Sequence, residues 1–372
     1  MKKGIITTVS FLLFIAVFSL GTFLTPSREF SENENRPLAS FPNINAESVS
    51  SGKAQSELNT YVSDQLVFRD FLVSLKSSVE KAAGMRESGG VYFAQDGYYI
   101  KKLSEQSVDD NGFLKNLNAV NTFFENNKKL GKSHITFLLS PTAGEILGDK
   151  LPAGTDYFDQ KSRIETAQNS IKNGTFVELY DDFLKTDESI YYKTDHHWTT
   201  RGAYLAYVNY CKALNKEPKK YKSEVFSEDF RGTLYSKAPY FGAEHDTVEL
   251  FKLQNEDDLT LFIGGEKADF PIYDLSKADA KDKYTVFFGG NYPQMRIESK
   301  NGKGNLLVIK DSYANSFLPF IAEDFGSITV VDPRYCQTPI SQIVKDNEIT
   351  DILLLYNIES FVSDEYIPLI TL

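Results

Sequence analysis

Hydrophobic residues first form one uninterrupted run in this chain and then follow two different periods. Residues 4–24 contain no charged side chain, and at 1.5 Å per residue they are long enough to cross a hydrocarbon core of about 30 Å. Residues 54–84 repeat apolar positions at helical spacing, as at Leu58, Tyr61 and Leu66. The pattern predicts a membrane-length helix followed by an amphipathic one.

Further along, short apolar runs alternate with helical patterns, which is typical of an α/β sheet. The predicted elements are a hairpin at 89–100 turning at Asp96-Gly97, a helix at 112–129, a strand at 135–139, a helix at 160–172, a strand at 176–180, and later a strand at 305–309, a helix at 315–324, a strand at 327–331, a helix at 339–347 and a strand at 351–356.

Between these two α/β stretches, residues 222–300 change to short strands and glycine-containing turns. The expected strands there are Gly232–Tyr235, Thr247–Phe251 and Tyr284–Phe288. We therefore predict a segment 1–25 that spans the membrane, a polar linker 26–53, and an α/β domain 54–372 with a β-rich insertion at about 222–300.

The apolar N-terminal run also predicts where in the cell the protein lies. Lys2 and Lys3 precede it, which indicates a cytoplasmic N-terminus and an exported remainder. The run is longer than a usual signal-peptide core and no clear cleavage site follows, so we expect an uncleaved single-pass anchor in the cell membrane. A cleaved signal, which would make the protein secreted, is the alternative.

Composition and charge limit the classes of molecule that this protein can bind. The 372 residues are 41% hydrophobic with a formal charge of −11; the first 24 residues carry +2, so −13 remains for the rest. This acidity argues against nucleic acid as a partner. Two cysteines, Cys211 and Cys336, exclude a zinc site built on cysteine pairs. Two free thiols are expected, with a disulfide between them as the alternative.

The candidate chemistry begins with residues 193–203, KTDHHWTTRGA. In an extended backbone, Asp195 and His197 leave the same face and His196 leaves the other. A carboxylate beside an imidazole is the orienting half of a nucleophilic triad. Thr199 is placed to cap a following helix. This motif indicates a hydrolase or transferase site and a structural role for His196.

The nucleophile expected for this pair is Ser312. It follows the apolar strand 305–309 at the turn into the next helix, so its hydroxyl should lie at the carboxyl edge of the sheet, where ligands bind in open α/β folds. The helix N-terminus offers unpaired N–H groups to an oxyanion. The alternative is that Ser312 only caps the helix; Ser316 is a weaker candidate nucleophile.

Asp195-x-His197-Trp198 together with Asp311-Ser312-Tyr313 resembles the DHHW family, which is related to the alginate O-acetyltransferase (AlgX/AlgJ-like) branch of SGNH hydrolases. The likeness includes further segments: Ser31–Arg36 (SENENR), Asp64-Gln65, Phe68-Arg69-Asp70, Asp96-Gly97-Tyr98 and Gly289-Gly290-Asn291-Tyr292. The resemblance implies a three-layer, flavodoxin-like α/β fold of the SGNH-hydrolase type. It also implies a triad of Ser312, His197 and Asp195.

The match to ordinary SGNH enzymes is incomplete. Lys310 stands where they have glycine, the Asp–His pair precedes the serine, and the Gly-x-Asn-Asp block is absent. The order matches the permuted acetyltransferase branch. The Ser312 and Tyr313 N–H groups are the expected oxyanion donors, and Gly290 and Asn291 are the stand-ins for the absent block. Arg69, Arg201, Arg334 and Tyr335 are candidates to line the cleft, and structural pairing with the excess acidic residues is the alternative role for each of them.

The resemblance implies an extracytoplasmic O-acetyltransferase that acts on a cell-envelope or secreted polysaccharide, needs no cofactor and receives acetyl from a membrane-bound O-acyltransferase. Three alternatives remain open at this point. The same triad could serve a carbohydrate acetylesterase, or the protein could be a non-catalytic glycan-binding envelope protein. The third is a metal site on Asp195, His196 and His197, for which only His134 and His245 remain as further imidazole ligands.

Overall fold

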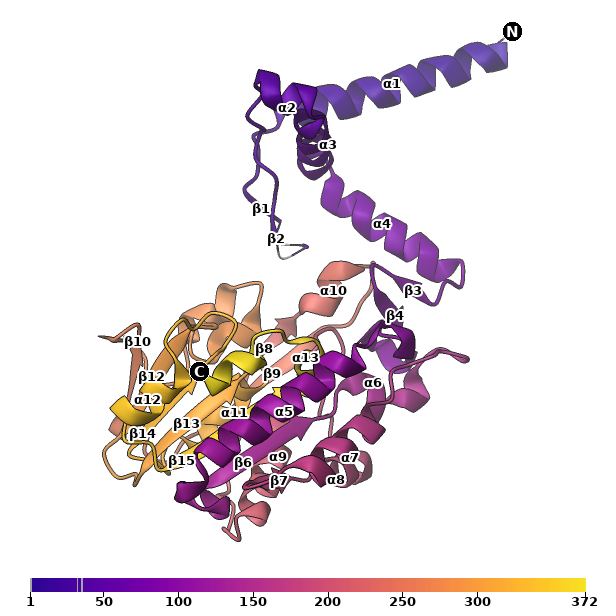
Figure 1. Cartoon of the computed structure of the whole chain (residues 1–372). Coiled ribbons are helices and arrows are strands. Elements are labelled where there is room, and N and C mark those ends of the chain that lie inside the picture. The colour runs from indigo at the N-terminus through magenta and orange to yellow at the C-terminus, as the bar shows by residue number, and fades with distance from the viewer. Residues whose placement is uncertain (1, 32, 35) are drawn as a thin grey trace. The chain divides into compact units, whose positions relative to one another are not determined.

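The computed structural model describes residues 2–31, 33–34 and 36–372, without the side chains of Lys2 and Lys3 (Figure 1). The described chain forms two compact units. The first contains the chain up to Gly89 together with Tyr235–Ala243, and the second contains Gly90–Leu234 and Glu244–Leu372. Glu32 and Asn35 of the SENENR segment lie outside the described residues.

The first unit is mainly helical. Its elements are α1 (Lys2–Leu24), β1 (Phe30–Ser31), β2 (Arg36–Pro37), α2 (Ala46–Ser50), α3 (Lys53–Gln65), α4 (Arg69–Ala82) and β3 (Glu87–Ser88). Within α1, Gly4–Leu24 is long and apolar enough to cross a membrane, with a mean hydropathy of 2.2, and none of the residues in its most apolar stretch is buried. This N-terminal helix is consistent with a membrane anchor or a signal sequence.

The polar segment predicted as a linker is tied into this unit. Arg36 forms an ion pair with Asp64 of α3 at 2.6 Å, and Glu34 pairs with Arg69 of α4 at 2.8 Å. The Arg36 side chain is the main cause that lowers the pKa of Asp64 to about 2. The described part of the segment 26–53 therefore contacts α3 and α4 and belongs to the first unit.

The second unit is built on an eight-stranded mixed sheet. Its spatial order is β11-β10-β12-β14-β13-β15-β6-β7. The strands are β6 (Ile135–Ser140), β7 (Thr175–Val177), β10 (Leu259–Ile263), β11 (Glu266–Lys267), β12 (Gln294–Ser299), β13 (Asn305–Lys310), β14 (Ser327–Val331) and β15 (Asp351–Asn357). Neighbouring strands are parallel to one another from β14 to β7. In contrast, β12 pairs antiparallel with β14 on one side and with β10 on the other.

The parallel part has the flavodoxin order after a circular permutation. When the strands are counted from β13 through β14 and β15 and then to β6 and β7, their spatial order is 2-1-3-4-5. In this arrangement the strand order reverses between β13 and β15. Ligands bind beyond the carboxyl ends of the strands at such a switch point. Ser312 follows β13 and therefore lies at this place.

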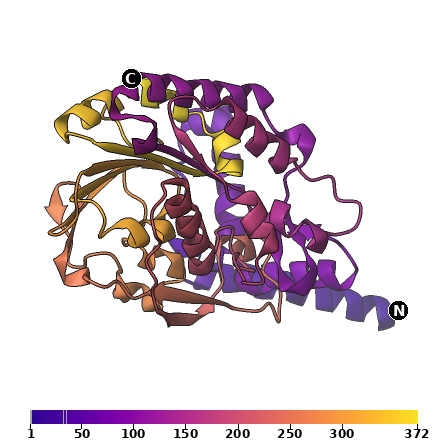
Figure 2. The same cartoon turned by 90° about the horizontal axis from the view of Figure 1, so that it is seen from below.

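Helices cover both faces of the sheet, so the unit has three layers (Figure 2). The β13 run Leu306–Ile309 shows why, because its side chains alternate between two separate cores. Leu306 and Val308 pack with α9 (Thr200–Ala213) and α11 (Ala314–Ile321). Leu307 and Ile309 pack in the core on the other face, with α5 (Asp110–Asn126), α7 (Gln160–Ser170), α12 (Ile340–Asp346), α13 (Ile358–Ser363) and η9 (Ile367–Thr371).

The β-rich region at 222–300 does not stand apart from the sheet. Its strands β10, β11 and β12 extend the central sheet beside β14, and only β8 (Ser223–Phe230) and β9 (Asp246–Phe251) form a separate two-stranded sheet. Side-chain periodicity indicates that a segment is a strand but does not reveal which sheet accepts it.

Most predicted elements of the α/β part are present within a few residues. The hairpin pairs β4 (Val91–Phe93) with β5 (Tyr99–Lys101), and Asp96 and Gly97 take positive φ at its turn. Short helices α6 (Ala143–Ile146) and α8 (Tyr180–Lys185) follow β6 and β7. Two predicted strands were wrong: the chain forms helix α10 (Thr233–Lys237) and the 3-10 turn η8 (Lys283–Val286) at those positions.

Candidate active site

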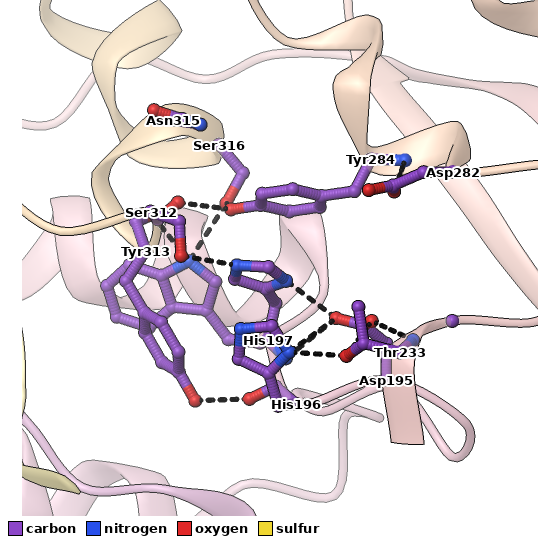
Figure 3. A network of polar contacts seen from close by, with 12 residues as sticks. Asp195, His196, His197, Thr233, Asp282, Tyr284, Ser312, Tyr313, Asn315 and Ser316 are labelled. Atoms are coloured by element: carbon purple, nitrogen blue, oxygen red, sulfur yellow. Dashed lines mark hydrogen bonds and ion pairs between the residues drawn. The ribbon is translucent and has the colours of Figure 1, made fainter. Parts of the chain in front are cut away.

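Ser312, His197 and Asp195 form one continuous hydrogen-bonded chain (Figure 3). His197 Nε2 lies 2.8 Å from Ser312 Oγ, and His197 Nδ1 lies 2.6 Å from Asp195 Oδ1. The carboxylate and the imidazole are buried, and Ser312 is half-buried. These distances are within the hydrogen-bond reach expected for a triad, and Ser312 remains partly open to solvent.

The local backbone that produces this geometry differs from the extended one predicted. Residues 193–197 run through a series of bends between an isolated bridge at Tyr191 and Trp198. Asp195 Oδ1 also accepts the N–H of His197 at 3.0 Å, which is the turn typical of aspartate. The carboxylate thus folds back onto its own backbone and holds both the N–H and the ring of His197.

This bend also overturns the prediction that His196 lies away from His197. The two imidazole rings pack together with centroids 3.8 Å apart, and His196 Nδ1 lies 2.6 Å from Thr233 Oγ1. His196 is partly exposed beside the triad (Figure 3). Successive side chains diverge only in extended backbone, which is absent here.

Asp195 is a buried carboxylate whose surroundings favour its charged form. Its second oxygen, Oδ2, accepts the Thr233 N–H at 2.7 Å and the Thr233 hydroxyl at 2.9 Å. Burial alone would raise the pKa of Asp195, but His196, His197 and these hydrogen bonds together hold it well below the ordinary range. Gly232 permits this approach, because a Cβ there would lie 2.6 Å from Asp195 Cγ.

Aromatic side chains fix the base and the nucleophile. The Tyr284 ring stacks on His197 with centroids 3.8 Å apart and planes 10° apart, and its hydroxyl donates to the Ser312 carbonyl at 3.0 Å. Trp198 Nε1 donates to the Tyr313 carbonyl at 3.0 Å and to Ser316 Oγ at 2.8 Å. Ser316 is fully buried in these contacts, so Ser312 is the serine that meets the histidine.

Asp311 holds the turn that carries Ser312. Its Oδ1 accepts the Tyr313 N–H at 2.9 Å, and its Oδ2 accepts the backbone and side-chain nitrogens of Asn357 at 2.8 and 2.7 Å. Burial raises the pKa of Asp311 to about 6, against these hydrogen bonds. The carboxylate therefore joins the ends of β13 and β15 on either side of the switch point.

These contacts also correct the donors assigned to an oxyanion. The Tyr313 N–H is engaged by Asp311, and the Tyr313 hydroxyl donates to the His196 carbonyl at 2.6 Å. Among the described residues none accepts the Ser312 N–H, which lies just before α11. The Ser312 N–H is therefore a better donor candidate than that of Tyr313.

Comparison with known proteins adds the family. The sequence profile described as "DHHW protein" matches residues 89–331, which include the Asp195–Trp198 motif and Ser312. The match covers more than half of the chain. This chain belongs to the DHHW protein family.

Three solved structures are similar to this DHHW protein, and the first two support its fold. A DHHW family protein from Eubacterium siraeum is 27% identical, with a TM-score of 0.61 over 76% of this chain and 95% of that one. Bacillus cereus PatB1, solved with a sulfonyl adduct, is 20% identical with a TM-score of 0.63 over 74% and 98%. The O-acetyltransferase domain of Pseudomonas putida AlgJ is 12% identical, with a TM-score of 0.49 over 76% and 98%. No curated protein matches the chain.

The three arginines among the cleft candidates form ion pairs with acidic residues, which is the alternative role expected for them; Arg69 pairs with Glu34 at 2.8 Å. Arg201 is paired with Glu249 at 2.6 Å and with Glu188 at 2.8 Å, and the cavity of about 360 Å³ that it lines contains no triad residue. The Arg334 guanidinium is held by buried Asp332 at 2.6 Å. Tyr335 is 53% exposed beside a cavity of about 400 Å³. The structure does not bring Arg201 to the triad.

The metal alternative has a partial geometric basis. One ligand atom each from Asp195, His196 and His197 lies within 4.8 Å of the others. These atoms already engage in short contacts, namely Asp195 with His197 at 2.6 Å and Thr233 with His196 at 2.6 Å. An ion would have to displace both contacts. The donor set therefore fits the hydrogen-bonded triad better than a metal.

Both cysteines are free thiols in the structure, as expected. Sequence reasoning did not identify Tyr284 and Thr233 as part of the site, because both lie in segments predicted as strands. A glycine-threonine pair at 232–233 is a weak signal of close backbone approach, and nothing in the sequence marks Tyr284.

Proposed function

We propose that this DHHW protein is an extracytoplasmic O-acetyltransferase that acts on a cell-envelope or secreted polysaccharide through a Ser312 acyl-enzyme. The observation that supports this most is the hydrogen-bonded chain Ser312–His197–Asp195 at a sheet switch point. The exposed apolar α1 supports an uncleaved membrane anchor with the second unit outside the cytoplasm.

The residues can divide the reaction as follows. His197 Nε2 takes the proton of Ser312 Oγ while Oγ forms a bond to the acyl carbonyl carbon. As the tetrahedral oxyanion collapses, the bond to the donor oxygen breaks and His197 returns the proton to that leaving group. A sugar hydroxyl then gives its proton to His197 while its oxygen attacks the acetyl-serine carbonyl carbon. The bond between that carbon and Ser312 Oγ breaks, and His197 returns the proton to Oγ. Asp195 keeps the His197 tautomer and stabilises the imidazolium.

The donor and acceptor belong to the proposal as well. An acetyl group would reach Ser312 from a membrane-bound O-acyltransferase partner, and the acceptor would be a hydroxyl of the polysaccharide. No cofactor is required, because the serine, the histidine and the N–H donors suffice for acyl transfer.

The decisive test uses the full-length protein in detergent. We expect it to release 4-nitrophenol from the acetate ester and to be labelled at Ser312 by a sulfonyl fluoride. Ser312→Ala should remove both signals, whereas Ser316→Ala should keep the label at Ser312 because its hydroxyl does not contact His197. Asp195→Asn should lower turnover about 10³–10⁴-fold by disturbing the tautomer.

Product partitioning separates transfer from hydrolysis. An added acceptor glycan should divert acetyl from water to sugar in a transferase, whereas unchanged acetate release would favour the acetylesterase alternative. Folded protein that shows neither turnover nor labelling would favour a glycan-binding role. Loss of activity with a chelator, restored by a divalent metal ion, would favour the metal alternative.

A further inference from the structure

A buried lysine lies two residues before the candidate nucleophile and has no part in the triad. Lys310 ends β13, and its side chain is 2% exposed. Its Nζ donates to Asn291 Oδ1 at 2.9 Å and to Asn315 Oδ1 at 2.8 Å. Asn315 Nδ2 in turn donates to Asn291 Oδ1 at 3.0 Å. Burying an ammonium group is costly. The buried carboxylate of Asp332, whose Oδ2 lies 3.9 Å from Nζ, offsets part of this cost, and the two amide oxygens are the nearer contacts.

The lysine fixes which way the amides point. An ammonium group only donates, so both asparagines must turn their oxygen toward it. The remaining atom of Asn315, its Nδ2, then faces Asn291 Oδ1, which accepts two hydrogen bonds. The Asn291 Nδ2 must therefore lie on the opposite edge of its amide plane. Among the described residues it donates to none.

The two residues that hold this amide, Lys310 and Asn315, flank Ser312 in the sequence. Asn315 lies one turn after Ser312 and donates its N–H to the Ser312 carbonyl at 3.2 Å. The loop that delivers Asn291 takes three successive positive φ values, at Phe288 (62°), Gly289 (79°) and Gly290 (142°). The two glycines adopt such values freely, but at Phe288 a positive φ is strained, and strain of this kind is typical of functional sites. The exposed Asn291 is therefore held at a defined place by buried contacts.

We propose that Lys310 is a positioning residue that orients and polarises Asn291 so that its Nδ2 donates to the oxyanion formed at Ser312. This inference rests on the proposed function and adds a residue that the triad does not contain. The positive charge at Asn291 Oδ1 draws electron density from the amide and strengthens Nδ2–H as a donor. Asn315, on α11, forms hydrogen bonds with both Lys310 and Asn291 and so helps to hold them in place.

A double-mutant cycle tests the assignment with the full-length protein in detergent. Loss of one oxyanion donor costs about 10²–10³ in kcat, so Asn291→Ala should lower kcat for 4-nitrophenyl acetate by about 100-fold. Lys310→Met should lower kcat 10- to 100-fold with little change in KM. The double variant should be no slower than Asn291→Ala, because the lysine acts only through the asparagine.

A matched control separates catalysis from folding. Lys219→Met also removes a shielded ammonium group, which pairs with Glu323 and Asp324, and should leave kcat unchanged. Each variant is checked for folding by circular dichroism. Additive losses in the double variant, or full activity of a folded Lys310→Met, would overturn the positioning role alone. A folded wild type with neither turnover nor Ser312 labelling would overturn the proposed function and this role with it.

Discussion

At the residue scale, Gly232 is as important to the site as the charged residues, because its missing side chain leaves room for Asp195. Gly232→Ala should push the carboxylate away from His197 and lower kcat/KM about 100-fold, since displacements near 1 Å can cost that much. The control is Gly148→Ala, where an added Cβ meets nothing within 4 Å. Esterase assays of both variants check this, and equal activities would contradict it.

Lys310 should give the activity an alkaline limit. Burial lowers its pKa from 10.5 to about 8; Asp332 and Asp311 raise it, and Arg334 lowers it further. The fold loss of kcat/KM caused by Lys310→Met should therefore shrink as the pH rises through about 8, where the wild type loses the charge. A ratio of the two activities that stays constant from pH 7 to 10 would contradict this.

The stability effect of the same group has the opposite sign. Between about pH 8 and 10.5 the unfolded chain binds more protons at Lys310 than the folded protein, so the free energy of unfolding rises with pH in that window. Chemical denaturation at pH 7.5 and 10 should show the wild type gaining stability relative to Lys310→Met while it loses activity.

At the element scale, Trp198 joins the bend that carries His197 to helix α11, which follows Ser312. Trp198→Phe removes the Nε1 donor and leaves the Tyr313 carbonyl and Ser316 Oγ without it. The free energy of unfolding should fall by about 1–3 kcal/mol. Tyr366→Phe on the surface, where the side chain is 47% exposed, should change it by less than about 0.5 kcal/mol. Denaturation followed by circular dichroism measures both, and equal effects would refute the coupling.

At the scale of the whole molecule, the first prediction concerns membrane attachment. We expect the full-length protein to stay with membranes after alkaline carbonate extraction and to retain residues 1–24, as read from its intact mass. Leu13→Arg places a charge near the centre of Gly4–Leu24, at a cost of about 2.5–3.5 kcal/mol, and should reduce this retention. Leu184→Arg, on an exposed side chain of α8, should not. A mature chain that lacks residues 1–24 would show that the segment is a cleaved signal.

The sequence by itself determined the five parallel strands, most of the helices and the two motifs of the site. Runs such as Leu306–Ile309 are apolar at every position because both faces of a parallel sheet are covered. Thr199 does cap α9, since its hydroxyl accepts the Gly202 N–H at 3.2 Å. These features depend on near neighbours in the chain, so their signals are local and readable.

Only the tertiary structure decided how the motifs are completed. The contacts of Asp195 with Thr233 and of His197 with Ser312 join residues 38 and 115 positions apart. The His197–Tyr284 stack and the Lys310–Asn291 contact also depend on the sheet that brings their segments together. A bend placed His196 beside His197, and strands β10–β12 of the β-rich region joined the central sheet. The periodicity of a sequence shows which face of a helix or strand is apolar. Which residues pack against that face depends on contacts between segments that are distant in the sequence.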